Sequence, residues 1–164
     1  KKSCVNLNLF VLKQVYLLQG IVIWCVTLPI QFVLIGDVED SISPINLIGL
    51  TIMLIGFLWE VISDNQLDNF KNNSSQSKDF LKTGLWAYSR HPNYFGEVFF
   101  WWGIFIFSLS TYFSLIAIIG PILFTYLIFN VTGVKTMDKR MSKNYPGYKD
   151  HIDSTNAMIP KILS

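Results

Sequence analysis

The sequence of 164 residues contains few charged side chains and many apolar ones. Charged residues make up 15% of the chain, against about 25% in an ordinary soluble domain. Hydrophobic residues make up 51%, and the mean hydropathy is +0.40. A soluble fold of about 150 residues buries only about 70% of the surface that its unfolded chain exposes. This composition therefore argues against a soluble globular protein and against a disordered chain.

Several binding chemistries lack the residues that they need. Cys4 and Cys25 are too few for a disulfide framework, and His91 and His151 lie in separate segments, so we expect no metal site. Neither a Gly-x-Gly-x-x-Gly loop nor a Gly-x-x-x-x-Gly-Lys loop occurs, which excludes a Rossmann or P-loop nucleotide site. A net charge of +2 is far from the dense basic surface of a nucleic-acid-binding protein, so we expect no nucleic-acid partner.

Three stretches without any charged residue indicate membrane-spanning helices. Residues 15–35 and 41–59 each have about the 20 apolar residues that a helix needs to cross a bilayer. The third stretch, 98–134, is nearly twice that length, so we expect a break at 108–111. Pro29 and Pro121 lie within these stretches, where neighbouring helices can tolerate a kink. The four predicted spans are residues 15–35, 41–62, 94–109 and 112–134, followed by a tail at 135–164.

The distribution of basic residues predicts the orientation of these spans. All 13 lie near the N-terminus, in the loop 63–93, or after Val134. Four spans place these regions on one side, and the positive-inside rule makes that side cytosolic. We therefore predict an all-α, polytopic integral membrane protein with a cytosolic helical C-terminal segment, forming a single membrane domain over residues 1–164. Because the chain starts at Lys1 without an initiator Met, we expect it to be the C-terminal part of a longer protein.

Acidic residues follow the second predicted span at helical spacing. Glu60, Asp64 and Asp68 are four residues apart, so a continuing helix would place them on one face. A helix end that meets water and a functional carboxylate site both fit this pattern. Glu60 is the stronger functional candidate of the three, because it lies nearest the membrane.

A polar segment precedes the third predicted span. Pro92 disfavours helical dihedral angles at the preceding residue, and Asn93 suits the N-cap of the following helix. Arg90 and Lys82 lie close by, so this helix start could bind a phosphate group, or the basic residues could anchor the span at the lipid headgroups. Glu97 lies one turn inside the helix, where we expect it to face a polar cavity.

The tail is rich in basic residues. Residues 135–151 contain five basic side chains, two acidic ones, Tyr145 and Tyr148. Contact with anionic lipid is the commoner use of such a segment, and binding of a ligand also fits.

The polar segment and its surroundings resemble the signature of a known superfamily. Residues 84–97, which include Arg-His-Pro-Asn-Tyr-Phe-Gly-Glu, and the following Trp101-Trp102-Gly103 are similar to the steroid 5-alpha-reductase C-terminal-domain superfamily, in its branch of poorly characterised multi-span membrane proteins. Residues 60–71 and 145–160 resemble the same branch. The resemblance extends over nearly the whole chain.

This resemblance implies a cofactor and a reaction. Reductases of the superfamily bind NADPH between the membrane helices and the C-terminal segment, without a Rossmann fold. By motif, Asn93 and Glu97 match residues that hydrogen-bond the cofactor, and Arg90 and Tyr94 flank them. The implied function is NADPH-dependent reduction of a C=C bond in a lipophilic, steroid- or lipid-like substrate, at the endoplasmic reticulum membrane in a eukaryote. The part of the tail that falls in the implied cofactor-binding region contains Arg140, Tyr145 and Tyr148.

The catalytic residues stay unassigned at this stage. In the steroid reductases, the catalytic acid and Tyr lie in the N-terminal half, which would be upstream of Lys1 in this chain. Within the given sequence, Glu60 and Asp64 are the weak candidates for catalytic residues. Two residues depart from the pattern of the branch: Asp138 stands where Glu is usual, and His151 stands where Tyr is common.

Two other functions remain open. Isoprenylcysteine and phospholipid methyltransferases share part of the motif but bind S-adenosylmethionine and carry a Glu-Glu pair after the last span. The matching stretch here is Met137-Asp138-Lys139-Arg140, and the Asn-Tyr-Phe-Gly-Glu run favours a reductase. A truncated membrane protein without catalytic activity is the third possibility.

Overall fold

The structure is a computed structural model of the chain that describes residues 12–36, 42–73, 79–111 and 114–161. These residues are all helical or irregular, and no strand occurs among them, in agreement with the predicted all-α class. Cys4 lies outside the described residues, and Cys25 is a free thiol. In chain order the elements are η1 (Leu12–Leu17), α2 (Leu18–Val26), α3 (Leu28–Ile35), α4 (Pro44–Asn73), η2 (Gly84–Ala87), α5 (Pro92–Ser108), η3 (Ser114–Ile118), α6 (Ile119–Leu127), η4 (Ile128–Thr132), α7 (Val134–Asn144) and α8 (Tyr148–Ser154).

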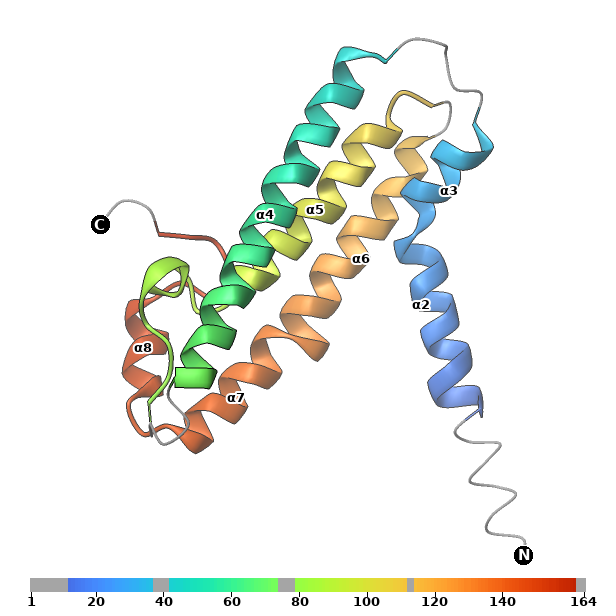
Figure 1. Cartoon of the computed structure of the whole chain (residues 1–164). Helices are drawn as coiled ribbons and strands as arrows, with labels where there is room; N and C mark the ends of the chain where they lie inside the picture. The colour runs from blue at the N-terminus through green and yellow to red at the C-terminus, as the bar shows by residue number, and fades with distance from the viewer. Residues whose placement is uncertain (1–11, 37–41, 74–78, 112–113, 162–164) are drawn as a thin grey trace, which may run out of the picture.

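The long helices run alternately in opposite directions (Figure 1). Helix α5 packs between α4 and α6, and the bent pair α2–α3 contacts α6 and α5. The end of α4, the start of α5, and helices α7 and α8 gather at one end of the bundle, which we call the α8 end (Figure 1). Two of the three regions that the sequence predicts on one side of a membrane therefore lie near one another: the described parts of the loop 63–93 and of the tail.

Glycines set the close packing of α4 against α5. Gly49 and Gly56 are seven residues apart on α4, and Gly96 and Gly103 are seven apart on α5. A Cβ atom on Gly96 would stand 2.6 Å from the backbone nitrogen of Glu60. Small residues let the backbones of membrane helices approach closely. This contact fixes the acidic part of α4 beside the first turns of α5.

Two to three helical segments are long and apolar enough to cross a membrane. They are α4 and the continuous segment Ser114–Asn144, with the pair Val15–Val26 and Leu28–Ile35 as a third if its 57° bend lies within one span. Pro29 stands at the start of α3, and the Gln31 side-chain amide donates to the carbonyl of Trp24 at 2.9 Å. The predicted kink at Pro29 is therefore present. Helix α5 has 17 residues, fewer than the about 20 that a bilayer core requires, and the four-span arrangement stays a prediction.

The boundaries of α5 test two expectations. Its end at Ser108 confirms the predicted break at 108–111. The prediction that Asn93 caps its N-terminus is wrong, because α5 begins at Pro92 and His91 occupies the N-cap position without a capping side chain. Proline favours the first helical position, since its fixed φ suits the helix and its missing N–H is not needed there.

Candidate functional site

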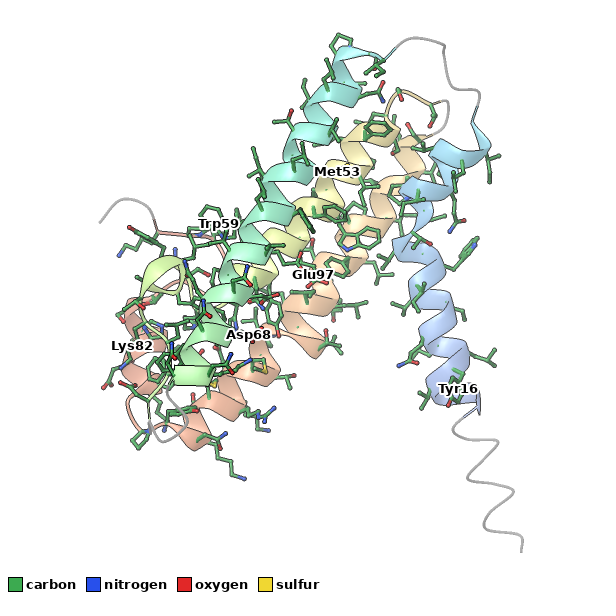
Figure 2. All side chains as sticks on the ribbon, viewed as in Figure 1. Tyr16, Met53, Trp59, Asp68, Lys82 and Glu97 are labelled. Carbon is green, nitrogen blue, oxygen red and sulfur yellow. The ribbon has the colours of Figure 1, made fainter. Side chains whose placement is uncertain are left out.

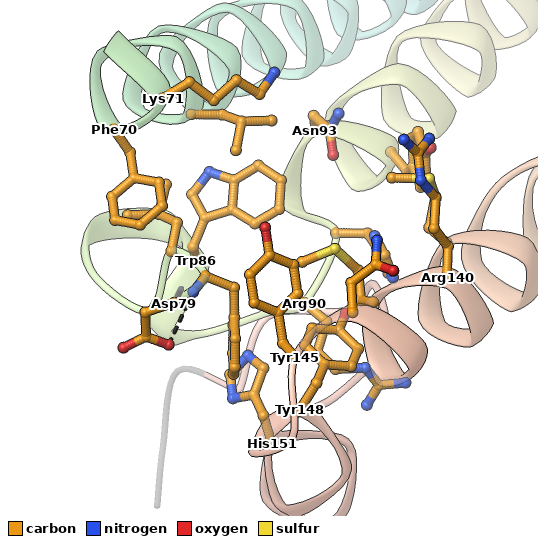
Figure 3. A pocket seen from close by; sticks show the side chains of 18 residues that line it. Phe70, Lys71, Asp79, Trp86, Arg90, Asn93, Arg140, Tyr145, Tyr148 and His151 are labelled. Carbon is orange, nitrogen blue, oxygen red and sulfur yellow. Dashed lines mark hydrogen bonds between the residues drawn. The ribbon is translucent and has the colours of Figure 1, made fainter. Parts of the chain in front are cut away.

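A cavity of about 360 Å³ opens at the α8 end, and we call it the rim cavity. The end of α4, the segment 79–91, the start of α5, and helices α7 and α8 form its wall. Figure 3 shows Lys71, Asn93 and Arg140 reaching it from three different helices. Its lining is mainly aromatic and basic, with Lys71, Phe80, Trp86, Arg90, His91, Tyr94, Arg140, Tyr145, Tyr148 and His151.

Asp138 of α7 links other segments of the α8 end to one another through hydrogen bonds. Arg90 donates from Nη2 to Oδ2 at 2.8 Å, and Tyr148 donates its hydroxyl to Oδ1 at 2.9 Å. Nε2 of His91 also lies 2.8 Å from Oδ1, and because a carboxylate only accepts, we assign the proton to this nitrogen. We call these four residues the Asp138 cluster. They connect the polar segment before α5 to both helices of the tail.

Further hydrogen bonds connect Arg90 and His91 to the backbone of the tail. Nη1 of Arg90 donates to the carbonyl of Ile152 at 3.0 Å. The backbone nitrogens of Arg90 and His91 donate to the carbonyls of Asn156 and Ala157 at 2.9 and 3.0 Å. Only 9% of Arg90 is exposed, and its guanidinium is occupied by bonds within the protein. Arg90 therefore holds the tail in place and contributes little free hydrogen-bonding capacity to the cavity.

The segment before Arg90 is anchored on the end of α4. Gly84 has φ of +64°, a conformation that a residue with a Cβ rarely adopts. The turn directs the Leu85 amide to the Gln66 side-chain oxygen at 2.9 Å, and the Trp86 indole to the Ser63 carbonyl at 3.0 Å. These two bonds fix the Trp86 ring in the wall of the rim cavity.

Aromatic rings fill the side of the cavity next to α8. Phe80 is buried, and its ring makes edge contacts with Tyr148 at 4.8 Å and with Tyr145 at 5.9 Å between centroids. His91 stacks on Tyr94 at 5.3 Å with an interplanar angle of 18°. Such ring pairs are rigid and apolar, and they give the cavity flat walls.

The protonation of two lining residues follows from their surroundings. Burial and the negative charge of Asp138 raise the pKa of Tyr148 above its usual value of 10, so its hydroxyl stays a donor at neutral pH. Burial and the positive charges of Arg90 and Lys82 lower the pKa of His151 below 6.5, so this ring is neutral at pH 7. Because His151 is neutral, the positively charged side chains that line the cavity are those of Lys71, Arg90 and Arg140.

Two lining groups remain available to a ligand. The side-chain oxygen of Asn93 is buried and has no hydrogen-bond partner among the described residues, which costs about 1–3 kcal/mol unless a ligand or water supplies a donor. Arg140 is exposed at the cavity, and the described part of the chain offers it no ion pair. A ligand with both anionic and N–H groups would satisfy them.

The structure brings together six of the residues that the sequence singles out and separates the other three. Arg90, Asn93, Tyr94, Arg140, Tyr145 and Tyr148 line the rim cavity. Glu97 lines a second cavity, and Glu60 and Asp64, which repel it electrostatically, line neither. The prediction that Glu97 faces a polar cavity is wrong, because the cavity that it lines has mainly apolar walls.

Sequence patterns assigned no role to Lys71. They showed only that Asp138 stands where the branch usually has Glu, and assigned no role to this residue either. Leu67, Phe70 and Lys71 all line the rim cavity, and their spacing of three and four residues marks one helix face, which could have identified Lys71. The role of Asp138 depends on contacts with residues 47 and 48 positions away, and no local pattern reports them.

These features define a class: an all-helical protein with two to three candidate membrane-spanning helices and a basic, aromatic cavity at one end. Within the described ranges, no group of three or more His, Cys, Asp or Glu residues is placed to hold a metal ion. The chain belongs to the family described as "Protein of unknown function (DUF1295)", which matches residues 2–155 and is tied to steroid 5-alpha-reductase-like membrane proteins. No curated protein and no solved structure matches the chain.

Proposed function

We propose that this protein is a membrane-embedded, NADPH-dependent reductase of a C=C bond in a lipophilic, steroid- or lipid-like substrate. It spans the membrane four times, with the α8 end and the C-terminus in the cytosol, and in a eukaryote the membrane is that of the endoplasmic reticulum. The resemblance of residues 84–97 to the superfamily signature supports this proposal. The observation that carries it is the basic and aromatic lining of the rim cavity.

The charge of the rim cavity favours an anionic ligand. Lys71, which has Asp68 at 3.4 Å in an exposed pair, and Arg140 line it. The one carboxylate in the lining is that of Asp79, which has Lys82 at 3.2 Å. Lysine and arginine side chains bind phosphate groups through charge-assisted hydrogen bonds. The volume of about 360 Å³ falls within the range of about 300–1,000 Å³ that is usual for small-molecule sites.

The lining residues fit the parts of NADPH. Arg140 and Lys71 bind its phosphates, and the Trp86 and Tyr145 rings offer flat surfaces to its bases. The unpaired oxygen of Asn93 accepts a hydrogen bond from an amide N–H. The Asp138 cluster keeps the tail in position, so that the cavity has a fixed wall on the side of α8. Bound NADPH supplies a hydride to the β-carbon of an activated C=C bond.

The same charges disfavour S-adenosylmethionine, which a methyltransferase would need. Its sulfonium and ammonium groups are positive, and Lys71 and Arg140 repel them. Asp138, the acid at the place where the methyltransferases carry a Glu-Glu pair, is already bonded to Arg90, His91 and Tyr148.

Ligand-dependent thermal unfolding of the full-length protein in detergent tests the proposal. NADPH at 100 times its Kd stabilises the folded state by about 2.7 kcal/mol, and S-adenosylmethionine at the same concentration has no effect. We expect Arg140→Gln to weaken NADPH binding about tenfold, since a hydrogen bond to a charged group contributes about 1.5–3 kcal/mol. Lys139→Gln is the matched control, because Lys139 precedes Arg140 on α7 but does not line the cavity. Stabilisation by S-adenosylmethionine alone, or by neither compound, would overturn the proposal.

A further inference from the structure

A second cavity, of about 370 Å³, lies along the side of the bundle between α2, α5, α6 and η4, and we call it the lateral cavity. Most of its lining is aliphatic or aromatic, with Val26 from α2, Leu127 from the end of α6 and Ile128 from η4. Helix α2 leans away from α6 toward its own N-terminus (Figure 1), and Tyr16 at that end is 65% exposed (Figure 2). The segment Ser114–Asn144, which forms part of its wall, is long and apolar enough to cross a membrane.

One charged side chain reaches this apolar cavity. Glu97 of α5 (labelled in Figure 2) lines it, and among the described residues the carboxylate has no hydrogen bond and no ion pair. Among the described residues, the negative charges of Glu60 and Asp64 repel it. A carboxyl group within a membrane is expensive unless it has a partner or lines a cavity with a function. The described part of the chain supplies no hydrogen-bond donor to Glu97, so a donor from a ligand would stabilise it.

The walls of the cavity come from two irregular helical segments. Residues 128–132 form a π-helical turn, stabilised by the Thr136 hydroxyl, which donates to the Val131 carbonyl at 2.9 Å. On the opposite wall α2 ends at Thr27, whose hydroxyl donates to the Ile23 carbonyl at 2.9 Å. Single π-helical turns occur frequently at functional sites. Helical turns held by hydrogen bonds therefore form the wall of the lateral cavity on both sides.

We propose that the lateral cavity binds an apolar alcohol, a long-chain or polycyclic hydrocarbon with one hydroxyl group, and that this hydroxyl donates a hydrogen bond to Glu97. The hydrocarbon body fills the space between α2 and α6, where it replaces contact with lipid. In its ionised form Glu97 only accepts hydrogen bonds, and the O–H group of the ligand is then the donor. Binding of this ligand does not require NADPH in the rim cavity, and the inference stands apart from the reductase proposal.

The placement of the two cavities relates this ligand to the rim cavity. Asn93 and Glu97 are four residues apart on α5, about 6 Å along the helix, and line the rim and the lateral cavity respectively. The start of α5 thus presents one polar group to each cavity. A ligand on Glu97 would lie within about one helical turn of a ligand on Asn93.

Photolabelling tests the proposal directly. The full chain in detergent is irradiated with a diazirine-bearing hexadecanol or with the matched diazirine hexadecane, and the labelled peptides are mapped by mass spectrometry. We expect the alcohol to label residues 22–27 and 127–132 at least fivefold more than the alkane does. Equal labelling by the two probes, or labelling spread over all exposed helix faces, would mean that the cavity takes up hydrocarbon without recognising the hydroxyl, and would overturn the proposal.

Variants locate the hydroxyl. Glu97→Ala should reduce labelling by the alcohol about tenfold and leave labelling by the alkane unchanged, whereas Asp153→Ala, a control at an exposed acid of α8 outside both cavities, should change neither. Unchanged labelling by the alkane also reports that the fold is intact. If Glu97→Ala does not fold, Glu97→Gln keeps the size of the side chain and should reduce labelling by the alcohol about threefold, since neutral hydrogen bonds are roughly half as strong. Full labelling by the alcohol in a folded Glu97 variant contradicts the proposal.

Discussion

The rim cavity and the lateral cavity are similar in volume and are built by different forces. Hydrogen bonds accepted by the side chains of Asp138 and Gln66 and by the Ser63 carbonyl fix the walls of the rim cavity. Helix packing sets the lateral cavity, through apolar side chains and interrupted helical turns. Loss of one polar group at the α8 end leaves its partners buried and unpaired, whereas a change in an apolar wall alters only local packing. The two regions should therefore differ in how sharply they respond to substitution.

The largest expected effect is that of Asp138→Ala. Arg90 is 9% exposed, so removing the carboxylate leaves a buried guanidinium without its ion pair. Breaking a buried pair in this way costs about 3–5 kcal/mol. Chemical denaturation in detergent should show a loss of that size in the free energy of unfolding. Asp68→Ala is the control, because its ion pair with Lys71 is exposed and contributes at most about 1 kcal/mol. Equal effects of the two substitutions would show that the Asp138 cluster does not hold the α8 end together.

The second prediction concerns the packing of α4 on α5, which both cavities share. In Gly96→Ala the new methyl group would stand 2.6 Å from the Glu60 nitrogen, a backbone atom, so the two helices must separate. Overpacking of this kind costs about 1–3 kcal/mol. Gly20→Ala on α2 is the control, since nothing lies within 4 Å of the added atom. Thermal unfolding should show a lower Tm for Gly96→Ala alone, and a Tm equal to that of the unmodified chain would contradict the close helix contact.

The two regions also differ in how far the sequence could predict them. The charge-free stretches predicted the helices and the break after Ser108, and the motif with the basic tail predicted six residues of the rim cavity. The sequence did not reveal that Glu97 faces another cavity, because that depends on how α2 packs against α6. It also placed the start of this helix near Tyr94 with Asn93 as the N-cap, whereas α5 begins at Pro92, a residue that favours the first helical position.

A third prediction concerns Trp86, which lines the rim cavity and not the lateral cavity. Trp86→Phe keeps an aromatic ring in the rim cavity but removes the indole hydrogen bond to the Ser63 carbonyl. One such bond contributes about 0.5–1.5 kcal/mol, so we expect a loss of about 1 kcal/mol in the free energy of unfolding. We also expect weaker stabilisation by NADPH, measured as a smaller shift in Tm, with unchanged photolabelling of the lateral cavity. A change in that photolabelling would mean that the two cavities are coupled through α4.

The smallest expected effect is a dependence of folding stability on pH, which arises from His151 at the α8 end. The pKa of His151 is lowered in the folded protein, so the unfolded chain binds the proton first as pH falls through about 6.5. Folding stability therefore decreases as pH falls from about 7.5 into this range, and the loss levels off below the folded-state pKa. His151→Gln should remove this part of the pH dependence and leave the stability at pH 8 nearly unchanged. Parallel denaturation curves at several pH values measure it as the difference between the two chains. A difference that is constant with pH would show that His151 is as accessible to protons in the folded cavity as in the unfolded chain.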